Sequence, residues 1–217
     1  MELIGWFIDF ILHLDRHLTA LIADYHLWIY VILFAIIYCE TGLVVTPFLP
    51  GDSLLFAVGA LAAVDATGTL DATYVWLLLI VAAILGNETN FRIGRAVGPR
   101  AFSGNFRWLK REYLLRTQAF YDKHGGKTIV LSRFVPIIRT FAPFVAGVGQ
   151  MQRQRFARYN FTGGIAWVTI FIWGGFLFGN IPLIKNNFGI VTILIIVLSL
   201  VPVAWGMLKP APKAASD

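Results

Sequence analysis

The stretch ETGLVVTPFLPGDS, residues 40–53, breaks an otherwise apolar part of the chain. It begins inside the apolar run 27–45 and is followed by a second apolar run, residues 54–64. At 1.5 Å per residue, that second run covers about half of the hydrocarbon layer of a bilayer. Two prolines and a glycine within five residues end a helix and reverse the chain. We therefore predict that residues 30–64 form a re-entrant helical hairpin, shaped by Pro47, Pro50 and Gly51.

The composition places the whole chain in a membrane. Its 217 residues are 58% hydrophobic with a mean hydropathy of +0.71, which is too apolar for a soluble or a disordered domain. Lys and Arg number 18 against 12 Asp and Glu, so the net charge is +6. These charges gather in loops between apolar runs, as in membrane proteins, and not over a surface for nucleic acid. A single membrane domain, residues 1–217, is expected, with no nucleic-acid partner.

The other segments follow from hydropathy and from proline and glycine positions. We predict an amphipathic N-terminal helix at 3–24, a spanning helix at 72–97, a basic cytoplasmic segment at 98–127, a second re-entrant hairpin at 128–150, spanning helices at 159–182 and 188–208, and a cytoplasmic tail at 209–217. The second hairpin contains Pro136 and Pro143, which shape it. The polar stripe of the first helix leaves open whether it crosses the membrane or lies at its surface.

The distribution of Lys and Arg orients these segments. Residues 92–127 and the tail are rich in basic residues, which places them in the cytoplasm by the positive-inside rule, and the N-terminus is expected there too. The first hairpin then opens outward and the second inward, which is the inverted-repeat arrangement of many transporters. The predicted fold is an all-α polytopic membrane protein, an inverted repeat with two facing re-entrant helical hairpins plus about three to four spanning helices.

Four ionisable residues lie inside apolar segments: Glu40, Asp52, Arg133 and Arg139. Each costs about 2.5–3.5 kcal/mol at the centre of a membrane helix unless it pairs or faces water. One interpretation is a structural ion-pair network that holds the two hairpins together. The other is functional, because a carboxylate in a membrane cavity can exchange protons and arginine binds phosphate in a bidentate way.

The chain contains four sequence motifs that point to a known family. They are Glu40 followed by PFLPGD at 47–52, GNETNFRIGRAVG at 86–98, RFVPIIR at 133–139, and Ala146-Gly147 with the aromatic and basic residues after it. Between residues 30 and 180 these motifs resemble the DedA family of bacterial inner-membrane proteins, within the superfamily of the SNARE-associated Golgi protein and VTT domains. Asn87 departs from the family pattern, in which an acidic residue more often follows the first glycine.

The resemblance implies a function and a set of residues. Family members depend on the proton-motive force and are implicated in returning undecaprenyl phosphate across the inner membrane. The family's essential acidic residues correspond to Glu40 and Asp52, which implies proton coupling, and its essential arginines correspond to Arg133 and Arg139, which implies phosphate binding. Supporting roles are expected for Ser53, Asn87, Glu88 and Arg95.

The leading hypothesis is therefore a bacterial inner-membrane flippase for a phosphorylated lipid carrier. Its partners would be an anionic or polyprenyl-phosphate lipid, protons and the bilayer, and a homo-oligomer is left open. The alternatives are a proton-coupled exporter of cations or drugs and a non-transporting scaffold. The sequence shows no nucleophile elbow, metal triad or nucleotide loop, so we expect no enzyme activity, no cofactor and no metal.

Overall fold

The computed structural model describes residues 18–19, 27–43, 51–65, 68–101, 125–185, 189–191, 193–195 and 197. Several predictions lie wholly or mostly outside these residues. They concern the N-terminal helix, the turn with Pro47 and Pro50, most of the basic segment, the last spanning helix and the tail.

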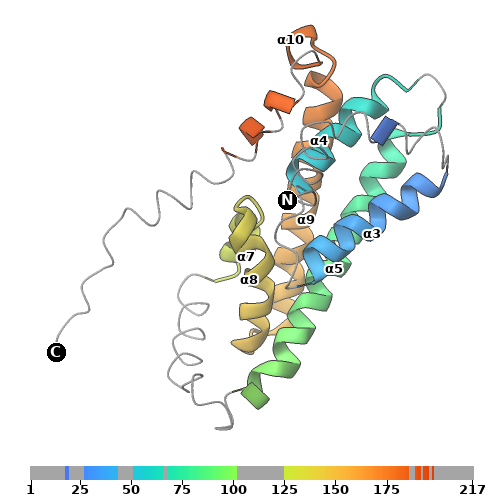
Figure 1. The fold of residues 1–217 in the computed structure, drawn as a ribbon. Helices are drawn as coiled ribbons and strands as arrows, with labels where there is room; N and C mark the ends of the chain where they lie inside the picture. Colours follow the sequence, from blue (N-terminus) through green and yellow to red (C-terminus); the bar gives the residue numbers. More distant parts are fainter. Residues whose placement is uncertain are drawn as a thin grey trace, which may run out of the picture.

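The described residues form helices without strands (Figure 1). These are α3 (Trp28–Gly42), α4 (Gly51–Ala62), α5 (Ala72–Ala101), α7 (Lys127–Ser132), α8 (Pro136–Val148), α9 (Arg153–Phe178) and α10 (Pro182–Lys185). By length and composition, Ala72–Gly98 and Arg153–Phe178 can each cross a membrane, whereas α3, α4 and the Ile138–Val148 part of α8 are shorter apolar helices. The all-helical class with apolar spans is confirmed. The re-entrant course of the hairpins stays a prediction.

The break between α7 and α8 follows from the proline at residue 136. Val135 has an extended backbone, with φ −125° and ψ 103°, as expected for a residue before proline. Pro136 begins α8, where its missing N–H needs no helical partner. Pro143 lies inside α8 and cannot donate the helical hydrogen bond to the Arg139 carbonyl.

The second long helix differs from its predicted range of 159–182. It begins at Arg153, so Arg155 and Arg158 lie on its first turns rather than in a loop, and it ends at Phe178. Arginine is a good helix former, so a cluster of basic residues does not by itself mark a helix boundary.

The two halves of the chain interlock (Figure 1). The long helices α5 and α9 pack on each other, α3 packs on α5, and α7 packs on α9. The most extensive contacts are crosswise, since α4 packs on α9 and α8 packs on α5. A short helix of each half therefore packs on the long helix of the other half.

Apolar side chains fill the space between these helices and also cover part of the outside. The larger buried cluster includes Leu33 and Ile37 of α3, Leu55 of α4, Leu79 of α5 and Ile172 of α9. The exposed apolar side chains include Leu77, Val81 and Leu85 on α5, and Ile170 and Leu177 on α9. An apolar outer surface on both long helices is what contact with lipid requires.

Glycines allow the crosswise helices to approach closely. Gly59 of α4 lies against the backbone of α9, and Gly175 of α9 lies against the backbone of α4. Gly94 of α5 and Gly147 of α8 are related in the same way across the other contact. A Cβ atom at any of these four positions would overlap a backbone carbonyl oxygen. Small residues commonly have this role where membrane helices meet.

Neighbouring glycines of α9 provide a matched test of this packing. A Cβ atom at Gly175 would collide with the Phe56 carbonyl, whereas one at Gly174 would meet nothing within 4 Å. Gly175→Ala should lower stability by about 1–3 kcal/mol through overpacking. Gly174→Ala should leave stability unchanged or raise it by up to about 1 kcal/mol, because alanine favours helix. Thermal unfolding in detergent measures both, and equal shifts would contradict the packing described here.

Candidate functional site: a buried charge cluster

The guanidinium of Arg139 on α8 joins two carboxylates from two other helices. Its Nη2 donates to Glu40 Oε1 on α3, and its Nη1 donates to Asp52 Oδ1 on α4. The exposed fractions are 7% for Arg139, 1% for Glu40 and 4% for Asp52. We call these three residues the Arg139 cluster. It joins α8 to α3 and α4, whose acidic residues lie 99 and 87 residues away from Arg139 in the sequence.

Trp167 adds the long helix α9 to this cluster. Its indole Nε1 donates to Asp52 Oδ1 over 2.8 Å, so that oxygen accepts from two donors. The guanidinium carbon of Arg139 lies 5.1 Å from the centre of the Trp167 ring, within range of a cation–π interaction. Only 1% of Trp167 is exposed, so this aromatic side chain lies in the interior and not on the outer surface.

The N-terminus of α4 lies against the Glu40 carboxylate. Gly51 is the first residue of α4, and a Cβ atom there would overlap the carboxylate of Glu40. Besides the predicted role in shaping the hairpin, glycine at this position therefore lets the backbone approach the acidic side chain closely. Glu40 and Asp52 both lie near the N-terminus of α4, where the positive partial charge of the helix attracts acidic side chains. Within the described part of the chain, Glu40 Oε2 is buried and has no hydrogen-bond partner.

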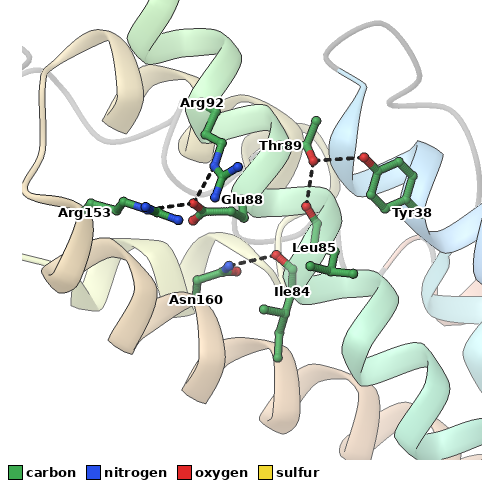
Figure 2. A network of polar contacts seen from close by, with 8 residues as sticks. All are labelled: Tyr38, Ile84, Leu85, Glu88, Thr89, Arg92, Arg153 and Asn160. Atoms are coloured by element: carbon green, nitrogen blue, oxygen red, sulfur yellow. Dashed lines mark hydrogen bonds and ion pairs between the residues drawn. The ribbon is translucent and has the colours of Figure 1, made fainter.

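Arg133, where α7 ends, has a different environment from Arg139. Its Nη2 donates to Asn160 Oδ1 over 2.5 Å and lies 3.4 Å from the carbonyl oxygens of Ala83 and Asn160. Asn160 in turn donates through Nδ2 to the Ile84 carbonyl over 3.0 Å (Figure 2). Only 2% of Arg133 is exposed, and its Nε has no partner among the described residues. The two acids therefore share Arg139, and a neutral amide holds Arg133.

Asn90 of α5 ties the helices beside the Arg139 cluster. Its Nδ2 donates to the carbonyl of Thr41, next to Glu40, over 3.2 Å and to that of Thr140, next to Arg139, over 2.8 Å. Asn90 is fully buried. It therefore fixes α3 and α8 at one height on α5.

The structure separates the four predicted supporting residues. Ser53 and Asn87 are buried, at 1% and 3% exposure, whereas Arg95 is exposed. Glu88 lies at the surface, where its Oε1 accepts from Arg92 Nε over 2.8 Å and from Arg153 Nε over 3.0 Å (Figure 2). Glu88 therefore connects α5 to the start of α9 and does not take part in the Arg139 cluster.

Asn160 and Trp167 were not singled out from the sequence. They are seven residues apart on α9, which places them on one face of the helix, with Gly163 and Gly164 between them. A Cβ atom at Gly163 would lie 3.2 Å from Arg133 Cδ, so this glycine makes room for the arginine. The sequence contained one signal for these residues. It was a polar residue, two small residues and an indole on one face of an apolar helix.

Comparison with known proteins identifies the family. The VTT domain family matches residues 49–177, and the chain is 53% identical over 203 residues to "Protein DedA" of Escherichia coli K12, covering 93% of this chain and 92% of that protein. The chain belongs to the DedA family. It is a membrane protein of that family, as its motifs indicated, and the matched region includes Asp52, Arg133 and Arg139.

Two further relatives carry membrane names. The chain is 39% identical over 189 residues to "Uncharacterized membrane protein ML0287" of Mycobacterium leprae, covering 84% of this chain and 82% of that protein. It is 32% identical over 203 residues to "Inner membrane protein YghB" of E. coli K12, covering 92% and 91%. No solved structure matches this DedA-family chain.

Removal of the Asn160 side chain tests how Arg133 is held. Asn160→Ala leaves a buried guanidinium without its closest acceptor, so we expect a loss of stability of about 1.5–3 kcal/mol. Arg92→Ala removes an exposed ion pair with Glu88 and should cost less than about 1 kcal/mol. Unfolding in detergent measures both variants. Equal losses would show that Asn160 does not hold Arg133.

Proposed function

We propose that this DedA-family protein is a transporter, not an enzyme, that uses the proton-motive force to move a phosphorylated lipid carrier across the bacterial inner membrane. The observation that carries the proposal is the Arg139 cluster, with a second buried arginine held apart from it at Asn160. The family resemblance supports undecaprenyl phosphate as the carrier. The similarity to the inner membrane protein YghB supports the inner membrane as the location.

The arrangement of charges favours function over a purely structural ion pair. A structural network is stable when its buried polar atoms are all paired, and each unpaired atom costs free energy. Here Glu40 Oε2 and Arg133 Nε are buried without partners within the described residues, and Arg133 makes no ion pair there. With one acid for each arginine, the four charges could neutralise each other. Instead both acids pair with Arg139, which leaves the guanidinium of Arg133 for an anion.

The Arg139 cluster suggests how the binding of a proton is coupled to the binding of a phosphate. Glu40 is the acid we propose to take the proton, because its Oε2 has no hydrogen-bond partner among the described residues, whereas Asp52 Oδ1 also accepts from Trp167. A proton on Glu40 removes the charge that holds Arg139 Nη2, which becomes available to a phosphate oxygen. Arg133 provides a second guanidinium. Loss of the proton restores the Glu40–Arg139 pair and releases the phosphate, which couples the two movements.

The predicted hairpins give this exchange a place in the membrane. We propose that residues 30–64 and 128–150 enter the membrane from opposite sides, with both termini in the cytoplasm. The crosswise packing of α4 on α9 and of α8 on α5 supports a two-fold related arrangement of the halves. Asp52 at the start of α4 and Arg139 on α8 would then meet near the middle of the bilayer.

One observation favours the second candidate, a proton-coupled exporter of cations or drugs. The Arg139 cluster contains two carboxylates and one guanidinium, an excess of negative charge that also suits a cation. The arginines would then have structural roles only.

Arg139→Lys distinguishes the two candidates. Lysine keeps the charge but lacks the planar fork that binds phosphate in a bidentate way, so lipid transport should fall about tenfold or more. The measurement is headgroup translocation in proteoliposomes with undecaprenyl phosphate and an imposed proton gradient. Unaffected lipid transport, or proton flux that depends on added cations without any lipid substrate, would favour the exporter.

Neutral variants of the acids test proton coupling. Glu40→Gln and Asp52→Asn keep the side-chain shape but cannot exchange a proton, so each should abolish the dependence of transport on the proton gradient. Glu88→Gln, at the surface ion pair, is the matched control and should keep that dependence. Amounts in the membrane and unfolding temperatures are measured alongside. If Glu40→Gln and Asp52→Asn only prevent accumulation of folded protein, the ion pairs are structural.

A further inference from the structure

Three arginines occupy the first turns of α9, and they differ in their partners. Arg153 donates to Glu88 of α5 over 3.0 Å (Figure 2). In the part of the chain that the structure describes, Arg155 and Arg158 form no ion pair with a carboxylate. Among the described residues, Arg155 and Arg158 thus differ from Arg153, which has a carboxylate partner.

Arg155 and Arg158 line a cleft of about 550 Å³. Its described walls consist of polar side chains with several hydrogen-bond donors: Gln152, Gln154, Arg155, Arg158, Tyr159 and Thr162. The volume is larger than one phosphate group needs, so it also admits the part of a headgroup next to the phosphate. A concave surface with two guanidinium groups, amides and a phenol favours an anion with several acceptor oxygens.

The turn that precedes α7 positions two of these side chains. Gly125, at φ +68°, lies so close to Arg155 that a Cβ atom there would be 3.0 Å from its Nη2. Gly126 lies against the ring of Tyr159, where a Cβ atom would overlap the ring. Arg155 and Tyr159 are therefore supported from outside their own helix.

The cleft lies at the start of a series of cation sites along α9. Tyr159 lines the cleft, the next residue, Asn160, holds Arg133, and Trp167 contacts both Arg139 and Asp52. At 1.5 Å per residue, Arg158 and Trp167 are about 14 Å apart along the helix axis. Along α9, Arg133 and then the Arg139 cluster therefore lie further from its N-terminus than the cleft does.

We propose that this cleft is a second anion site, separate from the buried cluster, that binds a phosphomonoester group at the membrane surface. A phosphate monoester offers up to two negative charges and three acceptor oxygens, which match two arginine forks with neighbouring neutral donors. Lipid headgroups and free inorganic phosphate share this chemistry. The role of the cleft as an arrival site rests on the proposed transport function, whereas binding to it does not.

Calorimetric titration of the full-length protein in detergent micelles tests the proposal. The probes are a water-soluble short-chain phosphatidic acid and inorganic phosphate. The double variant Arg155→Gln/Arg158→Gln should weaken binding about tenfold or more, because both charge-assisted contacts are lost. Arg153→Gln, which removes an arginine that already has a carboxylate partner, should change affinity by less than about twofold. Added salt should weaken binding to the unaltered protein.

The same titration in an Arg139→Lys background separates this site from the buried cluster. Binding that is retained in this background and still depends on Arg155 and Arg158 would support the cleft whether or not the transport proposal holds. Binding of the short-chain lipid alone would identify a lipid headgroup site, and binding of both probes would identify a general phosphate site. If the double variant does not fold, Arg155→Lys/Arg158→Lys replaces it and should weaken binding several-fold through loss of the forks. Unchanged affinity in the variant that folds would overturn the proposal.

Discussion

A buried guanidinium must be paired, and the way Arg139 meets this requirement organises the centre of the molecule. Its two ends bind Glu40 and Asp52, so α8, α3 and α4 are fixed relative to one another. Trp167 extends the contact to α9 by donating to Asp52 and lying beside the guanidinium. Removing one partner of such a cluster leaves an uncompensated buried charge, which typically costs several kcal/mol. The electrostatic requirement thus also determines helix packing.

The second buried arginine shows that the two embedded acids and the two embedded arginines do not pair one to one. Arg133 is held by the neutral side chain of Asn160 and by backbone carbonyls, although the chain contains two embedded acids. Both acids are engaged by Arg139, whose forked geometry can bind two carboxylates at once. The result is an acid-rich cluster next to an arginine that has no acidic partner in the described part of the chain. This asymmetry links the proton chemistry of Glu40 to the phosphate chemistry of the arginines in the proposed transport cycle.

Much of the fold could be predicted from local signals. Hydropathy and proline positions indicated helices, the two long apolar spans, and the interruption between α7 and α8 before Pro136. The start of α9 could not be placed in this way, because Arg153 to Arg158 are charged and yet suit a helix. The crosswise packing was also beyond local signals. It depends on glycines such as Gly59 and Gly175, whose role appears only when two backbones meet.

By itself, the sequence determined the membrane class, the family motifs and which ionisable residues are embedded in apolar segments. Composition and periodicity carry this information. Each segment must pair its own backbone hydrogen-bonding groups, and its side chains must suit the lipid, water or protein around it. Only the tertiary structure decided the partners. Arg139 pairs with acids 87 and 99 residues away in the chain, Arg133 pairs with Asn160, and Glu88 lies outside the cluster at the surface. Such choices depend on how helices from the two halves pack, and no local pattern encodes the distance between side chains on different helices.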